Sequence, residues 1–325
     1  MHSSQALLYL SRADVEQVAP DMPTIIRLLE EAFLEKARGG VEMPPKPGIH
    51  TRPDAFIHAM PAYIAGQRAA GMKWVSGYPE NQGRGLPYIA GLIVLNDVDT
   101  GFPYAVMDCT WLTAHRTGAA TALAARYLAR PDSTSVGILA CGVQGRTNLL
   151  ALAALFPLER AYAYDVNPEV QRRFVEEMSA SVGIEVRGVG SPAEAVTASD
   201  IVVTSGPIVR QPHATIQAEW VRPGTFASAV DYDSYWAPAA LAGFDTIATD
   251  DYEQFRYYKA HGYFQTTPDP GASLDELVSG QKPPRQRADE RTLAINLGLA
   301  LDDIAVAPEI YRRARDRGVG TWLPL

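Results

Sequence analysis

The sequence predicts an α/β protein in which a doubly wound parallel sheet of the Rossmann type follows an amino-terminal α+β domain. Strand-like and helix-like segments alternate from Ser135 to about Thr249, which is typical of a parallel sheet. The first third carries several short strand-like runs in succession, which favours a mainly antiparallel sheet. A glycine-containing turn joins the first strand of the alternating region to its helix and indicates how that region is used.

Length and composition indicate a soluble globular protein of two domains. The chain has 325 residues, of which 47% are hydrophobic and 20% are charged. Its net charge of −8 and its lack of a basic block argue against a nucleic-acid partner. No apolar run approaches the roughly 18 residues that a membrane span requires.

The amino terminus and the cysteines favour a cytoplasmic location. The first residues, Met-His-Ser-Ser-Gln, lack the basic and apolar regions of an export signal. Cys109 and Cys141 cannot form a disulfide framework, and both lie in apolar segments that favour buried thiols. No paired-cysteine or histidine spacing indicates a metal site.

The first region is predicted to begin with two helices. Ser11 can cap a helix near Ala13–Val18, and Thr24–Arg38 is amphipathic with Gly39 and Gly40 at its end. Four strand-like runs follow, at Phe56–Met60, Ala70–Ser76, Tyr88–Asn96 and Tyr104–Asp108. A further helix is predicted at Thr110–Arg130.

The second region is predicted to contain six strands, at 136–140, 160–164, 184–187, 200–204, 225–230 and 245–249. Asp250 to about Ala288 reads as irregular and polar, and Arg291–Arg317 reads as a helix. The short apolar tail from Gly320 to Leu325 is expected to fold back onto the first domain.

The turn after Val136–Leu139 has the spacing of a dinucleotide-binding motif. Ala140, Gly142 and Gly145 occupy its three glycine positions, an apolar helix follows, and Asp165 closes the next strand. Glycines let the backbone approach a pyrophosphate, and the acidic residue can hold ribose hydroxyls. The sequence therefore predicts a nicotinamide dinucleotide. The motif departs from the usual pattern at its first position, which is alanine. The alternative interpretation is a glycine-rich strand-to-helix turn that binds no ligand.

A carboxylate at Asp165 favours NAD over NADP, because it repels a 2′-phosphate, although NADP stays possible. Asn167 is ambiguous in this respect. The loop after Ile201–Val203 is expected to line the cofactor edge or to be a plain turn. The expected cofactor-binding residues are Arg116, Thr117, Gly142, Val143, Gln144, Gly145, Asp165, Asn167, Thr204, Ser205, Gly206 and Asp233.

Several motifs together resemble the ornithine cyclodeaminase/mu-crystallin family. They are Met43–Pro47, Met60–Tyr63, Lys73, Tyr78–Asn81, Arg84–Pro87, Asp108–Gly118, Gly142–Gln144 and the terminal Gly-Thr-Trp-Leu-Pro-Leu. The resemblance covers nearly the whole chain. It implies a substrate-binding and dimerisation domain of residues 1–115 and 300–325, a Rossmann domain of residues 116–299, and a homodimer.

The resemblance implies hydride exchange between a nicotinamide ring and the Cα of an α-amino acid or a cyclic ketimine. A substrate carboxylate needs fixed cations, which Arg116, Lys73 and Lys46 can supply. The family lysine matching Lys73 also moves a proton, and many relatives carry arginine where Lys46 stands. Met60 is expected beside the substrate. For each cation the alternative is a structural role.

Asp233 matches the family's catalytic aspartate, although Asp231 is a second candidate and a solvated turn residue is the alternative. The Ser234–Pro238 segment replaces the Pro-Gly and glutamate that relatives usually carry, so the substrate loop is altered.

His58 stands near the point where ornithine cyclodeaminases carry a glutamate for the distal amine, or it is a core histidine. Two other functions stay open. One is cyclodeamination with release of ammonia and recycled NAD, and the other is mu-crystallin-like binding of a dinucleotide and a ligand.

Overall fold

The computed structural model describes residues 6–52 and 55–325, and the chain divides into two compact units. Unit 1 comprises Met1–Arg116 and Leu299–Leu325, and unit 2 comprises Thr117–Gly298. Helix α3 (Thr110–Leu128) begins in unit 1 and continues in unit 2. Residues 1–5, on which the expectation about an export signal rests, lie outside the described residues.

The described strands of unit 1 form an eight-stranded mixed sheet in the order β16-β1-β7-β6-β5-β4-β2, with β3 paired to β4. All neighbours are antiparallel except β1 and β7, which confirms the predicted mainly antiparallel sheet. The strands are β1 (Ala6–Leu10), β2 (Val41–Glu42), β3 (Gly48–Ile49), β4 (Phe56–Ile64), β5 (Ala69–Gly77), β6 (Ile89–Asn96), β7 (Pro103–Asp108) and β16 (Thr321–Pro324).

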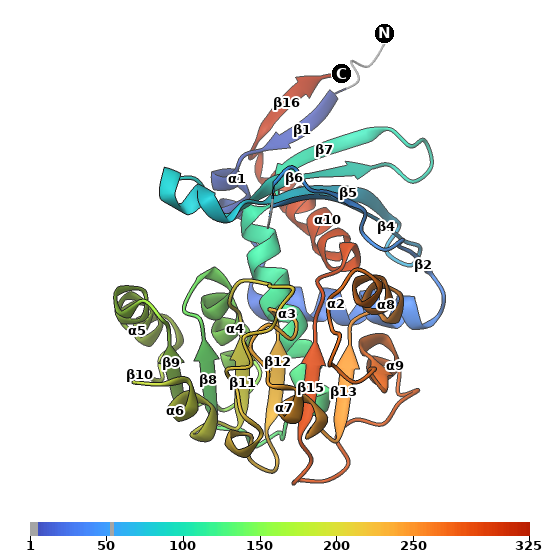
Figure 1. Cartoon of the computed structure of the whole chain (residues 1–325). Coiled ribbons are helices and arrows are strands. Elements are labelled where there is room, and N and C mark those ends of the chain that lie inside the picture. The colour runs from blue at the N-terminus through green and yellow to red at the C-terminus, as the bar shows by residue number, and fades with distance from the viewer. Residues whose placement is uncertain (1–5, 53–54) are drawn as a thin grey trace. The chain divides into compact units, whose positions relative to one another are not determined.

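Helices α1 (Arg12–Val18), α2 (Met22–Ala37) and α10 (Ala300–Arg317) complete unit 1, with a short 3-10 turn at Pro79–Arg84. Ser11 caps α1, as predicted. Figure 1 shows α10 running along the sheet of unit 1. Contact there is close, because a Cβ built on Gly71 of β5 would lie 3.1 Å from Ile304 Cδ1 on α10.

The carboxyl-terminal tail forms β16, which pairs antiparallel with β1 at the edge of the unit 1 sheet. This pairing confirms that the tail folds back onto the first region. Gly320, just before the strand, has φ +100°, and a Cβ there would lie 2.4 Å from Leu10 Cδ2. The close approach of the tail to β1 therefore requires a glycine at this position.

The described strands of unit 2 form an eight-stranded sheet, in the order β10-β9-β8-β11-β12-β15-β13-β14, with every pair parallel. The strand order reverses direction at β8, which confirms a Rossmann-type sheet. The strand arrows of unit 2 point to one edge in Figure 1. The strands are β8 (Ser135–Leu139), β9 (Arg160–Tyr164), β10 (Glu185–Gly188), β11 (Ile201–Thr204), β12 (Phe226–Ala229), β13 (Thr246–Thr249), β14 (Ala272–Ser273) and β15 (Thr292–Ile295).

The helices of unit 2 lie mainly between successive strands, as the alternating pattern predicted. They are α4 (Val143–Ala153), α5 (Pro168–Val182), α6 (Pro192–Thr197), α7 (Pro238–Ala242), α8 (Tyr252–Ala260) and α9 (Leu274–Val278), with a 3-10 turn at Ala218–Trp220. Across residues 6–52 and 55–325, every helix is too short or too polar to cross a membrane.

Two expectations for the last third of the chain were wrong. The start of Arg291–Arg317 is not helical, because Thr292–Ile295 forms β15 between β12 and β13, and α10 begins only at Ala300. A short apolar run buried on both sides has no alternation to distinguish it from a helix. The segment Asp250 to Ala288 is also more regular than expected, since Asp251 and Ser273 cap α8 and α9.

Candidate functional site

The predicted dinucleotide turn joins β8 to α4 in unit 2. Ala140, which stands at the first glycine position, has φ +76° and therefore lies in the left-handed region. Its N–H donates to the carbonyl of Tyr164 on β9 at 2.9 Å, which fixes the turn against the neighbouring strand. The methyl group is thus accommodated in a conformation that costs an L-residue about 1–2 kcal/mol.

The two glycines of the turn serve different purposes. A Cβ on Gly145 would lie 2.5 Å from the carbonyl oxygen of Ala140, so only glycine lets α4 pack this closely against the end of β8. Gly142 caps α4 without a side-chain hydrogen bond, and a Cβ there would meet nothing within 4 Å. An uncapped helix amino end beside open space fits the pyrophosphate of a dinucleotide, and Val143 and Gln144 are the first residues of that helix.

Asp165 follows β9 and is held at the same edge of the sheet. Its Oδ2 accepts from the Cys141 N–H and its Oδ1 accepts from the Asn167 N–H, both at 2.8 Å. Asn167 caps α5, with its side-chain oxygen accepting from Glu169 and Val170. The carboxylate of Asp165 is therefore fixed beside the turn, where it fits the ribose hydroxyls, while the Asn167 oxygen is used in the helix cap.

The loop after β11 lies next to the turn, because β11 and β9 flank β8. The Ser205 N–H donates to the carbonyl of Leu139 at 3.0 Å. The Thr204 hydroxyl and the Gly206 N–H donate to the two carboxylate oxygens of Asp231, at 2.6 and 2.8 Å. Thr204 is fully buried at the end of β11. Its hydrogen bond to Asp231 links this strand end to the segment that follows β12.

Asp231 and Asp233 follow β12 and are both buried. Tyr232, between them, has φ +64°, a strained conformation that places the two aspartates in different surroundings. Asp233 Oδ2 accepts from the Thr267 hydroxyl at 2.9 Å, whereas both oxygens of Asp231 are held by Thr204 and Gly206.

Burial raises the pKa of Asp231 to about 7, against the opposing hydrogen bonds from Thr204 and Gly206. Burial also raises the pKa of Asp233, opposed by the hydrogen bond from Thr267. Both groups can therefore hold a proton at a higher pH than an exposed aspartate does.

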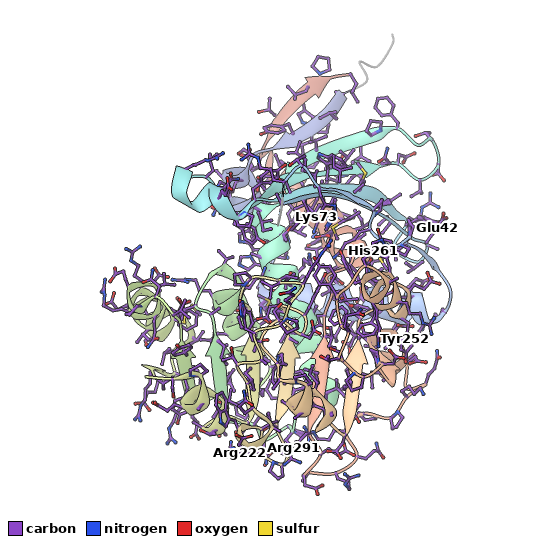
Figure 2. The ribbon with its side chains drawn as sticks, in the orientation of Figure 1. Glu42, Lys73, Arg222, Tyr252, His261 and Arg291 are labelled. Carbon is purple, nitrogen blue, oxygen red and sulfur yellow. The ribbon has the colours of Figure 1, made fainter. Side chains whose placement is uncertain are left out.

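Unit 1 buries two cations together. Lys73 on β5 and Arg116 on α3 both contact Asp303 on α10 (Figure 2 labels Lys73). The Lys73 Nζ lies 2.6 Å from Asp303 Oδ2, and the Arg116 Nε lies 3.2 Å from Asp303 Oδ1. The Arg116 Nη1 lies 3.3 Å from Asp302 Oδ2. These four side chains, called the charge cluster below, place the two predicted carboxylate-binding cations side by side.

Asp302 and Asp303 were not predicted from the sequence. Both are fully buried at the start of α10. The available signal was a pair of adjacent aspartates inside the apolar run from Leu299 to Ile304, since carboxylates are buried only with partners. Burial lowers the pKa of Lys73, and it raises the pKa of Asp302 to about 6.

The other predicted residues of unit 1 lie on or near β4. Met60 pairs in register with Lys73, and His58 pairs with Val75. The His58 ring stacks on Phe56 with a centroid separation of 4.3 Å. Burial, together with the positive charges of Lys46 and other nearby groups, lowers the pKa of His58 to about 3, so the ring is neutral. Lys46 itself is buried.

The predicted residues thus fall into two groups. Unit 1 holds Lys46, His58, Met60, Lys73 and Arg116, and unit 2 holds Thr117, Gly142, Val143, Gln144, Gly145, Asp165, Asn167, Thr204, Ser205, Gly206 and Asp233. Within unit 2, the turn, Asp165, the β11 loop and Asp233 all follow the carboxyl ends of parallel strands, where open α/β sheets bind ligands. Thr117 is a buried residue of α3.

Comparison with known proteins identifies one family over nearly the whole chain. The model of the ornithine cyclodeaminase/mu-crystallin family matches residues 7–318. The alanine dehydrogenase of Archaeoglobus fulgidus is 34% identical, over 97% of this chain and 97% of its own length.

Two solved structures resemble the chain as a whole. The Δ1-pyrroline-2-carboxylate reductase of Thermococcus litoralis, in complex with NADH and L-proline, has a TM-score of 0.88 at 36% identity and covers 97% of this chain and 99% of its own. An archaeal alanine dehydrogenase dimer with bound NAD has a TM-score of 0.87 at 33% identity and covers 98% and 99%.

Replacing Ala140 with glycine should stabilise the protein. Glycine adopts a positive φ without a steric penalty, so Ala140→Gly should raise the free energy of unfolding by about 0.5–1 kcal/mol, measured by urea denaturation. The matched change Ala153→Gly, in the right-handed last turn of α4, should lower it by about 1 kcal/mol. Equal losses in both variants would contradict the assignment of strain to Ala140.

Removing Asp303 should destabilise the protein strongly, because its carboxylate contacts both buried cations. Asp303→Ala should lower the free energy of unfolding by about 3–5 kcal/mol, measured by denaturant titration. Asp316→Ala, an exposed change on the same helix, should have little effect. A loss at Asp303 no larger than the loss at Asp316 would show that the cluster does not stabilise unit 1.

Proposed function

This chain belongs to the ornithine cyclodeaminase/mu-crystallin family, and from that premise we propose that it is an NAD-dependent oxidoreductase. The proposed reaction exchanges hydride with the Cα of an α-amino acid or a cyclic ketimine. The observation that carries the proposal is the buried pair Lys73 and Arg116, since two adjacent cations are suited to a substrate carboxylate.

Unit 2 would bind the dinucleotide. The uncapped amino end of α4 at Gly142 fits the pyrophosphate, and Asp165 fits the adenosine ribose of NAD. When bound, the nicotinamide accepts or supplies a hydride. The two solved relatives named above are described with NADH and with NAD, which supports the same cofactor here, and NADP is the less favoured choice.

Unit 1 would bind the substrate carboxylate. Arg116 offers a planar guanidinium for a directed grip, and Lys73 offers a compact charge whose pKa burial lowers. A lysine of lowered pKa can also release and recover a proton, which supports the predicted second role of Lys73. Lys46 would add positive charge, and Met60 would line the site through its register pairing with Lys73.

Asp233 is the proposed acid and base. Its carboxylate would take a proton from the substrate amine in oxidation, or activate water on an imine, and Thr267 would orient it through the hydrogen bond to Oδ2. Asp231 is the weaker candidate, because Thr204 and Gly206 already occupy both of its oxygens.

His58 argues against ornithine or lysine as substrate. A neutral imidazole, with a pKa of about 3, cannot supply the negative charge that a distal ammonium group requires. Dehydrogenation or imine reduction is therefore favoured over cyclodeamination. The set of Lys73, Arg116 and Asp233 likewise favours catalysis over a mu-crystallin-like binding role.

We also propose that the protein is a homodimer formed through the sheet of unit 1. Trp74 on β5 and Leu92 on β6 are paired in register and exposed, and Tyr9 and Leu323 are exposed on the same face of β1 and β16. Exposed aromatic and aliphatic side chains on strands of one sheet are suited to a self-complementary interface. The archaeal alanine dehydrogenase named above is described as a dimer.

The reaction is tested by incubating the enzyme with L-alanine, L-proline, L-ornithine and L-lysine, each with NAD and with NADP. We expect formation of reduced cofactor, with NAD preferred, and a loss in kcat of about 10²–10⁴-fold in Asp233→Asn. Cofactor binding without turnover of any of these amino acids, and without oxidation of NADH or NADPH by Δ1-pyrroline-2-carboxylate, would refute the proposal. Ammonia release from ornithine or lysine without net NADH would favour cyclodeamination instead.

Asp231→Asn is the companion variant for that experiment. We expect it to keep more activity than Asp233→Asn, because Asp231 serves in the proposal only to hold the loop after β11. The reverse order of activities would transfer the role of acid and base to Asp231.

The dimer is tested by placing charges on the exposed face of the unit 1 sheet. The double variant Trp74→Glu with Leu92→Glu should sediment as a monomer at concentrations where the unmodified protein is a dimer, because each charge would be buried at the interface. Val166→Glu, at an exposed apolar position of unit 2, should leave the dimer intact. A dimer that persists in the double variant would place the interface elsewhere.

A further inference from the structure

We propose that Asp302 sets the affinity of unit 1 for its substrate, because its carboxylate and the substrate carboxylate compete for Arg116. The inference rests on the proposed function, since it takes the ligand of Lys73 and Arg116 to be a carboxylate. Asp302 is thus a positioning residue, because it acts on the substrate through the guanidinium group of Arg116.

The competition follows from the donors of Arg116. A directed grip on a carboxylate uses two N–H groups of the guanidinium in parallel. Here Nε donates to Asp303 Oδ1 at 3.2 Å and Nη1 donates to Asp302 Oδ2 at 3.3 Å. The guanidinium has five N–H groups, and each of its two parallel pairs, Nε with Nη2 and Nη1 with Nη2, includes a nitrogen that already donates to Asp303 or Asp302. A carboxylate gripped by either pair must therefore share a donor nitrogen with an acidic side chain of unit 1, or displace that side chain.

Asp302 is the acid that gives way more readily. Asp303 is held by both cations, including Lys73 at 2.6 Å. Asp302 contacts Arg116 alone among the cations, and its Oδ2 also accepts from the Leu299 N–H at 3.1 Å. Its Oδ1 is buried and has no hydrogen-bond partner within the part of the chain that the structure describes.

Charge balance gives the competition its pH dependence. With all four groups ionised the charge cluster is neutral, so a carboxylate added at Arg116 gives these four groups one excess negative charge. A proton on Asp302 would remove that excess. The largest effects of charge on the pKa of Asp302 come from Arg116 on α3, Asp303 on its own helix and Lys73 on β5. Lys46 is buried in the free protein as well and is not among these largest effects.

The pKa of Asp302 lies in a useful range for this exchange. Burial raises it to about 6, Arg116 opposes the rise, and Asp303 adds to it. Above about pH 6 the carboxylate of Asp302 is ionised, and binding of a substrate carboxylate must be accompanied by uptake of a proton. Affinity is then highest at low pH and falls by up to about tenfold per pH unit as the pH rises.

The test measures binding of pyruvate, L-alanine and L-proline to the enzyme with NADH or NAD, by calorimetry at pH 6 and pH 8. Pyruvate is included because it has no amine to titrate. For the unmodified protein we expect a dissociation constant at least about tenfold higher at pH 8 than at pH 6. Calorimetry in two buffers of different ionisation enthalpy should show uptake of close to one proton at pH 8.

Asp302→Asn is the principal variant, because asparagine is isosteric and can still accept from the Leu299 N–H. It should bind the same compounds at pH 8 at least about tenfold more tightly than the unmodified protein, with little pH dependence and no proton uptake. Asp316→Asn makes the same change in net charge at an exposed position of α10, and should behave as the unmodified protein does.

The outcomes separate this inference from the proposed function. Binding of a carboxylate with the same pH dependence in Asp302→Asn would refute the inference and leave the proposed function standing. Absence of proton uptake when the unmodified protein binds a carboxylate at pH 8 would also refute the inference. This measurement does not depend on whether the variant folds. Failure of the unmodified protein to bind any of the three compounds at either pH would refute both.

Discussion

Unit 1 depends on pairing Lys73 and Arg116 with Asp302 and Asp303. An ion left unpaired in a protein interior costs several kcal/mol, so neither cation could be buried alone. Both carboxylates come from α10, nearly two hundred residues after Arg116 in the chain. The chain must therefore complete the whole of unit 2 before it can neutralise the cations of unit 1.

This requirement explains several features of the carboxyl-terminal segment. Gly71 allows α10 to approach β5 closely enough for Asp303 to reach Lys73, two residues further along that strand. The tail then continues into β16, which pairs with β1 and so ties the end of the chain to unit 1. An apolar helix alone could cover the sheet, but only one that carries acidic side chains at its start can cover Lys73.

The sequence was most informative where local geometry restricts the residue type. The turn from Ala140 to Gly145 was recognised from its spacing, because a close strand-to-helix approach excludes side chains at the last position. The helix cap at Ser11 was recognised for a similarly local reason. By contrast, β15 was mistaken for helix, and Asp302 and Asp303 were overlooked, because their places are set by partners distant in sequence. The choice between Asp231 and Asp233 also depended on contacts, from Thr204, Gly206 and Thr267, that spacing does not reveal.

The same charge pairing bears on which substrates the proposed site can accept. A diamine needs a carboxylate for its distal ammonium group, but the two buried acids of the charge cluster already contact Lys73 and Arg116. His58 adds no negative charge, since burial and the nearby positive charges of Lys46 and Lys73 keep its ring neutral. If the substrate carboxylate displaces Asp302 from Arg116, the proposed uptake of a proton leaves Asp302 neutral, so it offers no negative charge to an ammonium group. The surroundings of Lys73 therefore favour substrates that carry a carboxylate and no second positive charge, and that preference arises from the ion pairs rather than from the shape of the site.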